Sequence, residues 1–437
     1  MQTLKQLLSG ELKGTKTLKL SCELKEFPKE IFELKDTLEL LDLSNNQLSQ
    51  IPENFSDFKK LKIAFFSENY FTEFPSVFND CENLTMIGFK SNKIYFIPEN
   101  AFPINLQWLI LTNNCIKKLP KSIGGCLKLQ KVALAGNQLK ELPIEMAQCK
   151  NIELLRISAN QISEFPEWLF SLPRLSWLAV SGNPFFKTEN IEDELPLIDW
   201  KDLYMKEVLG EGASGIISKA EMNTDANKKE VAVKVFKGEV TSDGYPEDEM
   251  NACIEAGNHK NLVTVIGKIN NHPEQKMGLV LELIPSHFKN LAGPPSFDSC
   301  TRDTFKEGTE FDINIIQKIC TSIADANKHL HSKGIMHGDL YAHNTLIDDQ
   351  ANTVFGDFGA ATVYNILDKN ANYFERIDVR AFGCLIEDLL NQNHQPINPL
   401  KQSLLNLKES CLIPDILGRP NFKEIYLKLN SLISLKN

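Results

Sequence analysis

Residues 337–344 read His-Gly-Asp-Leu-Tyr-Ala-His-Asn, and residues 357–359 read Asp-Phe-Gly. Two further stretches precede them: residues 209–215 read Leu-Gly-Glu-Gly-Ala-Ser-Gly, and residues 231–234 read Val-Ala-Val-Lys. Each stretch alone is weak evidence for any function. The four stretches in this order indicate a site that holds a nucleoside triphosphate with magnesium and moves its terminal phosphate.

Gly210, Gly212 and Gly215 form the pattern Gly-x-Gly-x-x-Gly. Dinucleotide-binding folds share this spacing, but there the glycines lie between a strand and a helix. Here an extended stretch follows at 216–220, then a polar turn and a second extended stretch at 231–235. The order predicts a hairpin flap over phosphate groups, because glycine lets the backbone approach phosphate oxygens closely.

The first half of the chain is periodic. Asparagines recur every 22 or 23 residues, at Asn46, Asn69, Asn92, Asn114, Asn137, Asn160 and Asn183. The same apolar rhythm precedes each, as with Leu106, Leu109 and Leu111 before Asn114. The period predicts stacked strand-and-turn units that share one core, in which the asparagine amide satisfies backbone groups of adjacent turns.

This pattern resembles the leucine-rich repeat, and the resemblance implies an α/β solenoid of about eight repeats over residues 1–186, the first of them atypical. The outward strand positions should line its concave face: Leu40, Ile63, Phe65, Met86, Trp108, Ile110, Leu154, Arg156 and Trp177. A mostly apolar exposed row can be merely tolerated, but protein binding is the favoured interpretation. The partner would be another protein or the second half of the chain.

Bulk properties exclude several classes of protein. The chain has 437 residues, a net charge of −10, 42% hydrophobic and 24% charged residues, which fits two or three soluble domains without affinity for nucleic acid. No apolar run is long enough to span a membrane, and the start does not read as a secretory signal. Ten cysteines without a Cys-x-x-Cys pair read as small buried residues, which predicts a cytoplasmic protein.

Residues 187–197 are polar and acidic and are interpreted as a linker. From residue 198 to residue 437 the four motifs resemble the eukaryotic-type protein kinase, in the form of a leucine-rich-repeat kinase. The resemblance implies a bilobal α+β domain with a small lobe at 198–285 and a large lobe at 286–437. It also implies an ATP- and Mg²⁺-dependent kinase whose repeat array recruits a protein partner or substrate.

The resemblance assigns catalytic roles to individual residues. Asp339 would be the base that orients and deprotonates the acceptor hydroxyl, and Lys234 would pair with the phosphates. Asn344 and Asp357 would bind magnesium. In the family, the lysine at this position pairs with a glutamate on the next helix. Counting along the sequence, the position of that glutamate falls on Met250, and Glu249, one residue away, is the predicted partner of Lys234.

The same resemblance predicts an adenine pocket beneath the flap. Its lining, besides the glycines and Lys234, would be Leu209, Ile217, Ala232, Leu281, Glu282, Ile284 and Leu346. Ile217 and Ala232 would lie above the ring and Leu346 below it, with Leu281 at the back. The backbone at Glu282 and Ile284 would hydrogen-bond the adenine edge.

The chain departs from the family in three places. Gly338 replaces the arginine that normally pairs with a phosphate on the activation loop. Tyr341 stands where serine/threonine kinases carry a lysine, and His343 stands where tyrosine kinases carry an arginine. The expectation is serine/threonine specificity. The segment after Asp357 is short and lacks Ala-Pro-Glu. A pseudokinase scaffold and a small-molecule phosphotransferase, which can share the His-Gly-Asp-Leu spelling, are the alternatives; the sequence does not indicate an oligomeric state.

Overall fold

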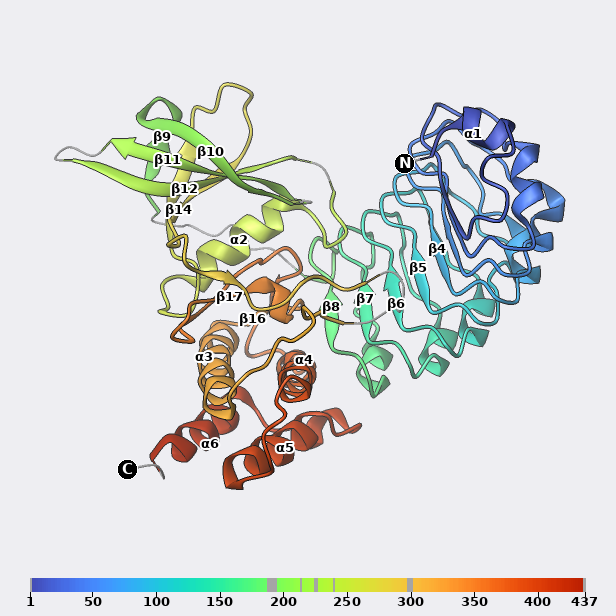
Figure 1. Ribbon diagram of the computed structural model, residues 1–437. Coiled ribbons are helices and arrows are strands. Elements are labelled where there is room, and N and C mark those ends of the chain that lie inside the picture. Colours follow the sequence, from blue (N-terminus) through green and yellow to red (C-terminus); the bar gives the residue numbers. More distant parts are fainter. Residues whose placement is uncertain are drawn as a thin grey trace. The chain divides into compact units, whose positions relative to one another are not determined.

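The computed structural model describes residues 2–186, 195–212, 214–223, 227–238, 240–296 and 302–434. The chain folds into two compact units (Figure 1). The first comprises Met1–Leu175 with Asn183–Phe185, and the second comprises Ser176–Gly182 with Phe186–Asn437. Most of the predicted linker, residues 187–194, lies outside the described residues, so the linker boundaries stay a prediction.

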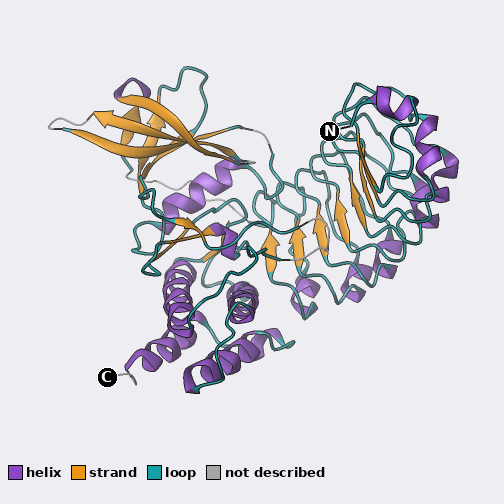
Figure 2. Ribbon diagram, viewed as in Figure 1, coloured by secondary structure: helices purple, strands orange, loops and turns teal. Residues whose placement is uncertain are grey.

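The first unit is the predicted repeat solenoid. Its short strands pair in parallel on one side and its helical turns lie on the other (Figure 2). The strands are β1 (Thr17–Lys19), β2 (Leu40–Asp42), β3 (Ile63–Phe65), β4 (Met86–Gly88), β5 (Trp108–Ile110), β6 (Lys131–Ala133) and β7 (Leu154–Arg156), preceded by helix α1 (Leu4–Leu8). The helical turns are η1 (Lys29–Leu34), η2 (Glu53–Asp57), η3 (Ser76–Asp80), η4 (Lys121–Gly125), η5 (Ile144–Gln148) and η6 (Glu167–Ser171). Each begins directly after a proline, whose fixed φ suits the residue before a helical turn.

The recurring asparagines connect successive repeats as predicted. The side chain of Asn137 accepts a hydrogen bond from the backbone N–H of Ile116 at 3.1 Å. Its Nδ2 donates to the carbonyls of Leu111 and Leu134, both at 2.9 Å. One buried amide therefore satisfies three backbone groups that would otherwise be buried without partners.

Replacement of Asn137 by alanine is expected to lower the free energy of unfolding by about 3 kcal/mol, since three buried backbone groups lose their partner. Urea denaturation followed by circular dichroism measures the change. Asn79 is exposed on the helical side and bonds only its neighbour Asp80, so Asn79→Ala is the matched control. Equal stability of the two variants would contradict the bridging role of Asn137.

The predicted concave row is continuous but only partly accessible. The register aligns Leu40, Ile63, Met86 and Trp108 on β2 to β5 and Leu154 on β7, with Lys131 of β6 between the last two. Phe65, Ile110 and Arg156 lie two residues further along β3, β5 and β7. Ile63, Met86 and Arg156 are buried, whereas Leu40, Phe65, Trp108, Ile110 and Leu154 are half-buried. The ring of Phe65 lies over Gly88, where a Cβ would approach it to 2.6 Å. Lys131 lies over the Trp108 ring at 4.5 Å, which favours a cation–π contact.

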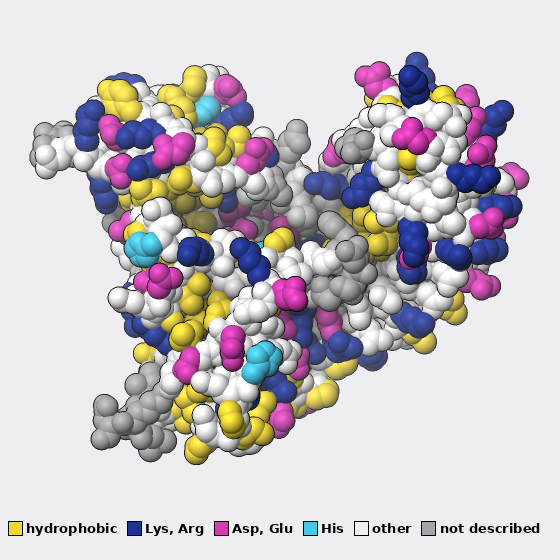
Figure 3. All heavy atoms as spheres, in the orientation of Figure 1, with side chains coloured by type: hydrophobic (Ala, Val, Ile, Leu, Met, Phe, Trp, Pro, Cys, Tyr) yellow, Lys and Arg dark blue, Asp and Glu magenta, His cyan; other side chains and the backbone are white. Residues whose placement is uncertain are grey.

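The small lobe of the second unit is a mixed sheet with one helix. Its strand order is β10-β11-β12-β14-β13-β9, and β9 pairs in parallel with β13 while the others are antiparallel. The elements are β9 (Leu197–Asp199), β10 (Leu203–Glu211), β11 (Gly215–Asn223), β12 (Lys228–Phe236), helix α2 (Pro246–Ala256), β13 (Val265–Asn270) and β14 (Gly278–Glu282). Charges of both signs intermingle over β10 to β12, in keeping with ion pairs such as Lys206–Glu221 (Figure 3).

The large lobe is mostly helical, with short strands around the motif loops. Its helices are α3 (Ile313–Ser332), α4 (Ala371–Asn391), α5 (Pro399–Cys411) and α6 (Phe422–Ser434). Its strands are β15 (Lys289–Asn290), β16 (Ile335–Met336), β17 (Thr345–Ile347), β18 (Thr353–Phe355) and β19 (Thr362–Val363). The second unit also includes β8 (Trp177–Ala179), which carries the last copy of the repeat pattern in sequence.

The nine cysteines within the described residues are all free thiols, as the sequence predicted, but Cys22 is exposed and Cys115 and Cys253 are half-buried rather than buried. Cys81, Cys126 and Cys149, at equivalent places in their repeats, are buried. Burial raises the pKa of the Cys149 thiol to about 11, so it stays protonated. In the described part of the chain, we find no helix with the length and apolar character needed to cross a membrane.

Candidate functional site

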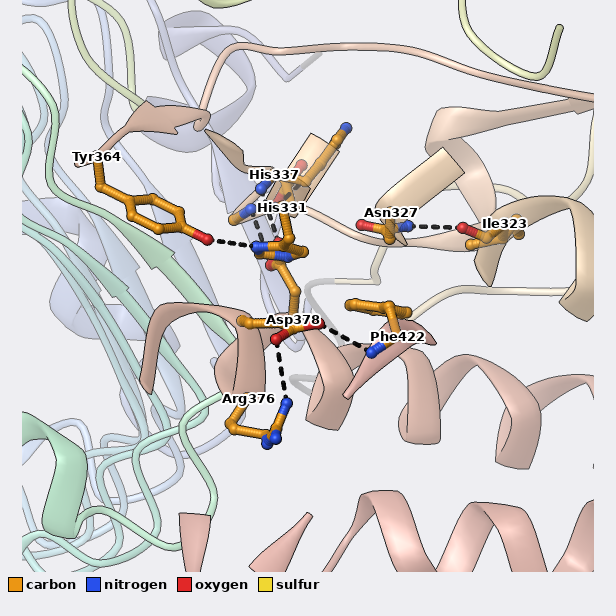
Figure 4. Close-up of polar contacts among 11 residues, drawn as sticks. Ile323, Asn327, His331, His337, Tyr364, Arg376, Asp378 and Phe422 are labelled. Carbon is orange, nitrogen blue, oxygen red and sulfur yellow. Dashed lines mark hydrogen bonds and ion pairs between the residues drawn. The ribbon is translucent and has the colours of Figure 1, made fainter. Parts of the chain in front are cut away.

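The start of the loop at residues 337–344 is fixed by a buried aspartate on α4. Asp378 accepts hydrogen bonds from the backbone N–H groups of His337 and Gly338 at 2.7 and 3.0 Å. It also lies 3.0 Å from Nε2 of His331 on α3, whose Nδ1 lies 2.9 Å from the Tyr364 hydroxyl (Figure 4). A proton on Nε2 of His331 satisfies both contacts. Two helices of the large lobe thus fix the loop, and the sequence analysis did not identify either anchor.

A second carboxylate holds the end of the same loop. Asp303 accepts from the backbone N–H groups of Ala342 and His343, at 2.8 and 3.1 Å, and contacts the His343 ring at 2.7 Å. Burial lowers the pKa of His343, but the hydrogen bond and charge of Asp303 outweigh that effect and raise it. Sequence reasoning also missed Asp303, because it lies in an irregular segment without any recognisable motif.

Between these anchors, Asp339 and Asn344 face each other. Nδ2 of Asn344 donates to Oδ2 of Asp339 at 2.7 Å and to its backbone carbonyl at 3.0 Å. Both amide hydrogens are therefore used, and the amide is oriented with Oδ1 as the remaining acceptor. Such an oxygen is a suitable ligand for a hard cation.

His337 connects the loop to the segment before Asp357. Burial lowers the pKa of its imidazole and favours the neutral form. Its Nδ1 accepts from the backbone N–H of Asp339 at 3.3 Å, and its Nε2 donates to the carbonyl of Gly356 at 3.1 Å. The backbone carrying Asp339 is therefore tied to the residue just before Asp357.

In the small lobe, Lys234 on β12 forms an ion pair with Glu249 on α2. The Glu249 side chain is buried, with an exposed fraction of 2%, and the Lys234 side chain is 12% exposed. Burial lowers the pKa of Lys234, but the charges of Glu249 and Asp357 outweigh that effect and raise it, so the ammonium stays charged. The helix begins with Pro246, and this start places Glu249 rather than Met250 against the lysine.

The negative charge of Asp357 influences ionisable groups in both lobes. It acts on Lys234 in the small lobe and on His337 and His343 in the large lobe. Lys234, Asp339, Asn344 and Asp357 therefore share one region. No group of three or more His, Cys, Asp or Glu suited to a metal occurs among the described residues. The oxygens of Asn344 and Asp357 fit Mg²⁺, which commonly takes one or two protein ligands together with phosphates and water.

The flap has the predicted strand order. The hairpin of β10 and β11 carries Gly210 and Gly212, where a Cβ would meet no atom within 4 Å. At Gly215 a Cβ would lie 2.6 Å from the carbonyl of Val235, so glycine is needed there. Leu209, next to the first glycine, is half exposed, and the side chain of Lys237 donates to Glu211 at 2.7 Å.

Strand pairing in the small-lobe sheet places several of the residues predicted to line the adenine pocket on neighbouring strands. Ile217 pairs with Lys234, and Ala232 pairs with Leu281 at the end of β14. The backbone N–H of Glu282 donates to the carbonyl of Thr264 at 2.9 Å and is therefore not available to a ligand. Ile284 lies two residues after the end of β14, and Leu346 lies on β17 in the large lobe; both are half-buried.

The segment after Asp357 is short in the structure as well. The helix α4 begins at Ala371 and already contains Glu375. Glu375 pairs with Arg376 at 3.1 Å and accepts from the backbone N–H of Phe422 at 2.9 Å.

The carboxylate of Asp248, next to Glu249 in the sequence, has a raised pKa. Burial raises the pKa of Asp248, on α2, to about 6, and the charge of Glu247 adds to the shift. Because the folded-state pKa exceeds the unfolded value, ionisation destabilises the fold increasingly between about pH 4 and pH 6. The full cost is present above that window and absent below it.

Asp248→Asn is therefore expected to stabilise the protein at pH 7.5 by roughly 2 kcal/mol, allowing for partial exposure, and to have little effect at pH 4. Thermal unfolding at the two pH values measures this difference. Glu255→Gln, on the same helix, is the control. A stabilisation that does not change with pH would show that burial of the charge is not its cause.

Comparisons with known proteins find both a protein kinase domain and leucine-rich repeats in this chain. Residues 203–374 match the protein kinase domain family, and residues 127–185 and 37–58 match leucine-rich repeat families. The chain is 32% identical over 299 residues to the probable serine/threonine-protein kinase kinY of Dictyostelium discoideum, covering 56% of this chain and 50% of that protein.

More distant relatives match a similar share of the chain. Another probable serine/threonine-protein kinase of Dictyostelium discoideum is 24% identical over 269 residues, covering 54% of this chain and 18% of that protein. The angiopoietin-1 receptor of Danio rerio is 20% identical over 282 residues, covering 54% of this chain and 25% of that protein. The chain spans half or less of the length of these curated relatives.

Proposed function

Because this chain combines leucine-rich repeats with a protein kinase domain, we propose that it is an ATP- and Mg²⁺-dependent protein kinase. The observation that carries the proposal is the charged cluster of Lys234 with Glu249, Asp339 with Asn344, and Asp357. Two of the relatives named above are probable serine/threonine kinases, which supports serine or threonine as the acceptor.

In the proposed reaction Asp339 accepts the proton of the acceptor hydroxyl and aligns its oxygen for attack. Asn344 restrains the Asp339 carboxylate through its hydrogen bond of 2.7 Å. Lys234, kept charged by Glu249, holds the phosphates. These residues act mainly by positioning and by electrostatic stabilisation.

Asn344 and Asp357 would hold magnesium through one amide and one carboxylate oxygen. The ion, when bound, supplies positive charge that offsets the charge of the phosphates. The flap of Gly210, Gly212 and Gly215 would cover the same phosphates, and the lining around Ala232 and Leu281 would receive the adenine.

We further propose that the half-buried residues of the concave row, Phe65, Trp108 and Ile110 among them, bind a protein partner or substrate. Aromatic residues are frequent anchors of protein interfaces. The short segment after Asp357 leaves substrate recognition to another surface, and this row is a suitable one.

The test is incubation of the purified chain with γ-labelled ATP, Mg²⁺ and a cell lysate, followed by phosphoamino acid analysis. Label on serine or threonine is expected, and chelation of Mg²⁺ should abolish it. Binding of ATP without any transfer would favour a pseudokinase scaffold. Transfer to small alcohols or sugars alone would favour a small-molecule phosphotransferase.

A further inference from the structure

The segment Ser176–Gly182 packs against the catalytic loop inside the second unit. The Trp177 ring stacks on the Tyr341 ring, with centroids 4.3 Å apart and an interplanar angle of 7°. Its Nε1 donates to the carbonyl of Leu340 at 3.1 Å. Trp177 is 1% exposed and Tyr341 is 3% exposed. A buried tryptophan therefore contacts both residues that directly follow Asp339, and it does not belong to an open partner-binding row.

The same segment explains the unusual glycine before Asp339. Gly338 has φ +70°, and a Cβ there would overlap the carbonyl oxygen of Leu178 and lie 2.8 Å from that of Ala360. The backbone of β8 thus occupies the space into which a side chain at position 338 would extend. An arginine cannot be accommodated there without displacing β8.

Two contacts hold the segment at its ends. Arg380 on α4 donates to the Ser176 hydroxyl at 2.6 Å, and the same helix carries Asp378, which binds the start of the loop. At the other end Gly182 has φ +69°, and a Cβ there would lie 2.9 Å from the Tyr245 ring and 3.0 Å from Asp248. The segment therefore touches α2, the helix of Glu249, as well as the catalytic loop.

We propose that Trp177 is a positioning residue for phosphoryl transfer, and that the segment Ser176–Gly182 does the work that a phosphate-binding arginine does when it orders a catalytic loop. The proposal rests on the kinase function proposed above. Its basis is that one rigid segment touches the loop beside Asp339 and the helix that presents Glu249. Displacement of a reacting group by about 1 Å can cost about a hundredfold in rate.

The test compares the full-length chain with Trp177→Leu, which removes the stacking and the hydrogen bond, and Trp177→Phe, which keeps an aromatic ring but lacks the donor. Trp168→Leu, at a half-buried position in the first unit, is the control. Hydrogen exchange of peptides covering 337–345 reports on the loop independently of activity. Steady-state kinetics with ATP and a substrate protein give kcat and KM.

Trp177→Leu is expected to raise exchange in 337–345 by about tenfold and to lower kcat by roughly 10- to 100-fold. The KM for ATP should change less than twofold, because the nucleotide pocket is not altered. Trp177→Phe should fall between this variant and the wild type, and Trp168→Leu should match the wild type. A purely structural role would change exchange throughout the second unit.

Unchanged hydrogen exchange of residues 337–345 in Trp177→Leu would overturn the proposal. A higher KM for ATP with an unchanged kcat would overturn it as well. If Trp177→Leu fails to fold, Trp177→Phe decides the question by the same two measurements. Absence of phosphotransfer by the wild type would reject the proposed function instead, and loop exchange alone would then decide whether Trp177 orders the loop.

Discussion

Asp339→Asn is expected to lower the rate of phosphotransfer by roughly a thousandfold, because the amide cannot accept the proton of the acceptor hydroxyl. The substitution is nearly isosteric, and an asparagine oxygen can still accept the hydrogen bond that Asn344 donates at 2.7 Å. Folding and Mg²⁺–ATP binding should therefore be preserved. Single-turnover transfer of labelled phosphate measures the rate, and calorimetric titration measures nucleotide binding.

Asp349→Asn is the matched control, since Asp349 is an exposed aspartate a few residues further along the chain. It should retain the full rate. Transfer by Asp339→Asn at a rate within tenfold of the wild type would show that another group takes the proton. Loss of nucleotide binding would instead show that Asp339 acts on the metal or the phosphates.

Lys234→Met is expected to abolish measurable phosphotransfer and to destabilise the protein as well. The substitution leaves Glu249, only 2% exposed, without its cation. Removing one partner of a buried pair costs about 3–5 kcal/mol, which corresponds to a fall in melting temperature of roughly 6–15 °C for a domain of this size. Thermal unfolding and labelled-phosphate transfer measure the two effects.

Glu249→Leu in the same background separates the two effects. The double variant should regain most of the lost stability, because no unpaired charge remains buried. It should stay inactive, because the cation that we propose to hold the phosphates is still missing. A double variant no more stable than Lys234→Met would indicate that the destabilisation comes from lost packing, for example against Phe236, whose ring lies 5.2 Å from the lysine.

Local patterns predicted much of the fold. The asparagine period predicted the strands and turns of the first unit, since each repeat forms the same bonds, as at Asn137. Spacing also predicted the flap hairpin and placed Lys234 on a strand. Counting along the chain gave Glu249 only to within one residue, because the start of α2 at Pro246 sets which side chain faces the lysine.

The residues that hold the site together could not be predicted in the same way. Asp378 and Asp303 bind the loop from 41 and 39 residues away along the chain, and Trp177 binds Leu340 across 163 residues. Such pairs have no period and no fixed spacing, since tertiary packing alone brings them together. The sequence showed that Gly338 replaces the usual arginine. Only the structure shows why a side chain does not fit there, because the carbonyl of Leu178 occupies the space.

The membership of Ser176–Gly182 in the second unit bears on how the protein can be divided by engineering or by gene fusion. A truncation that begins at the predicted domain start, residue 198, would discard Trp177 and leave Tyr341 facing solvent. Such a fragment would carry all four motifs and still lack the side chain that contacts Leu340 and Tyr341. A fusion that replaces the repeats should therefore keep Ser176–Gly182 with the second unit.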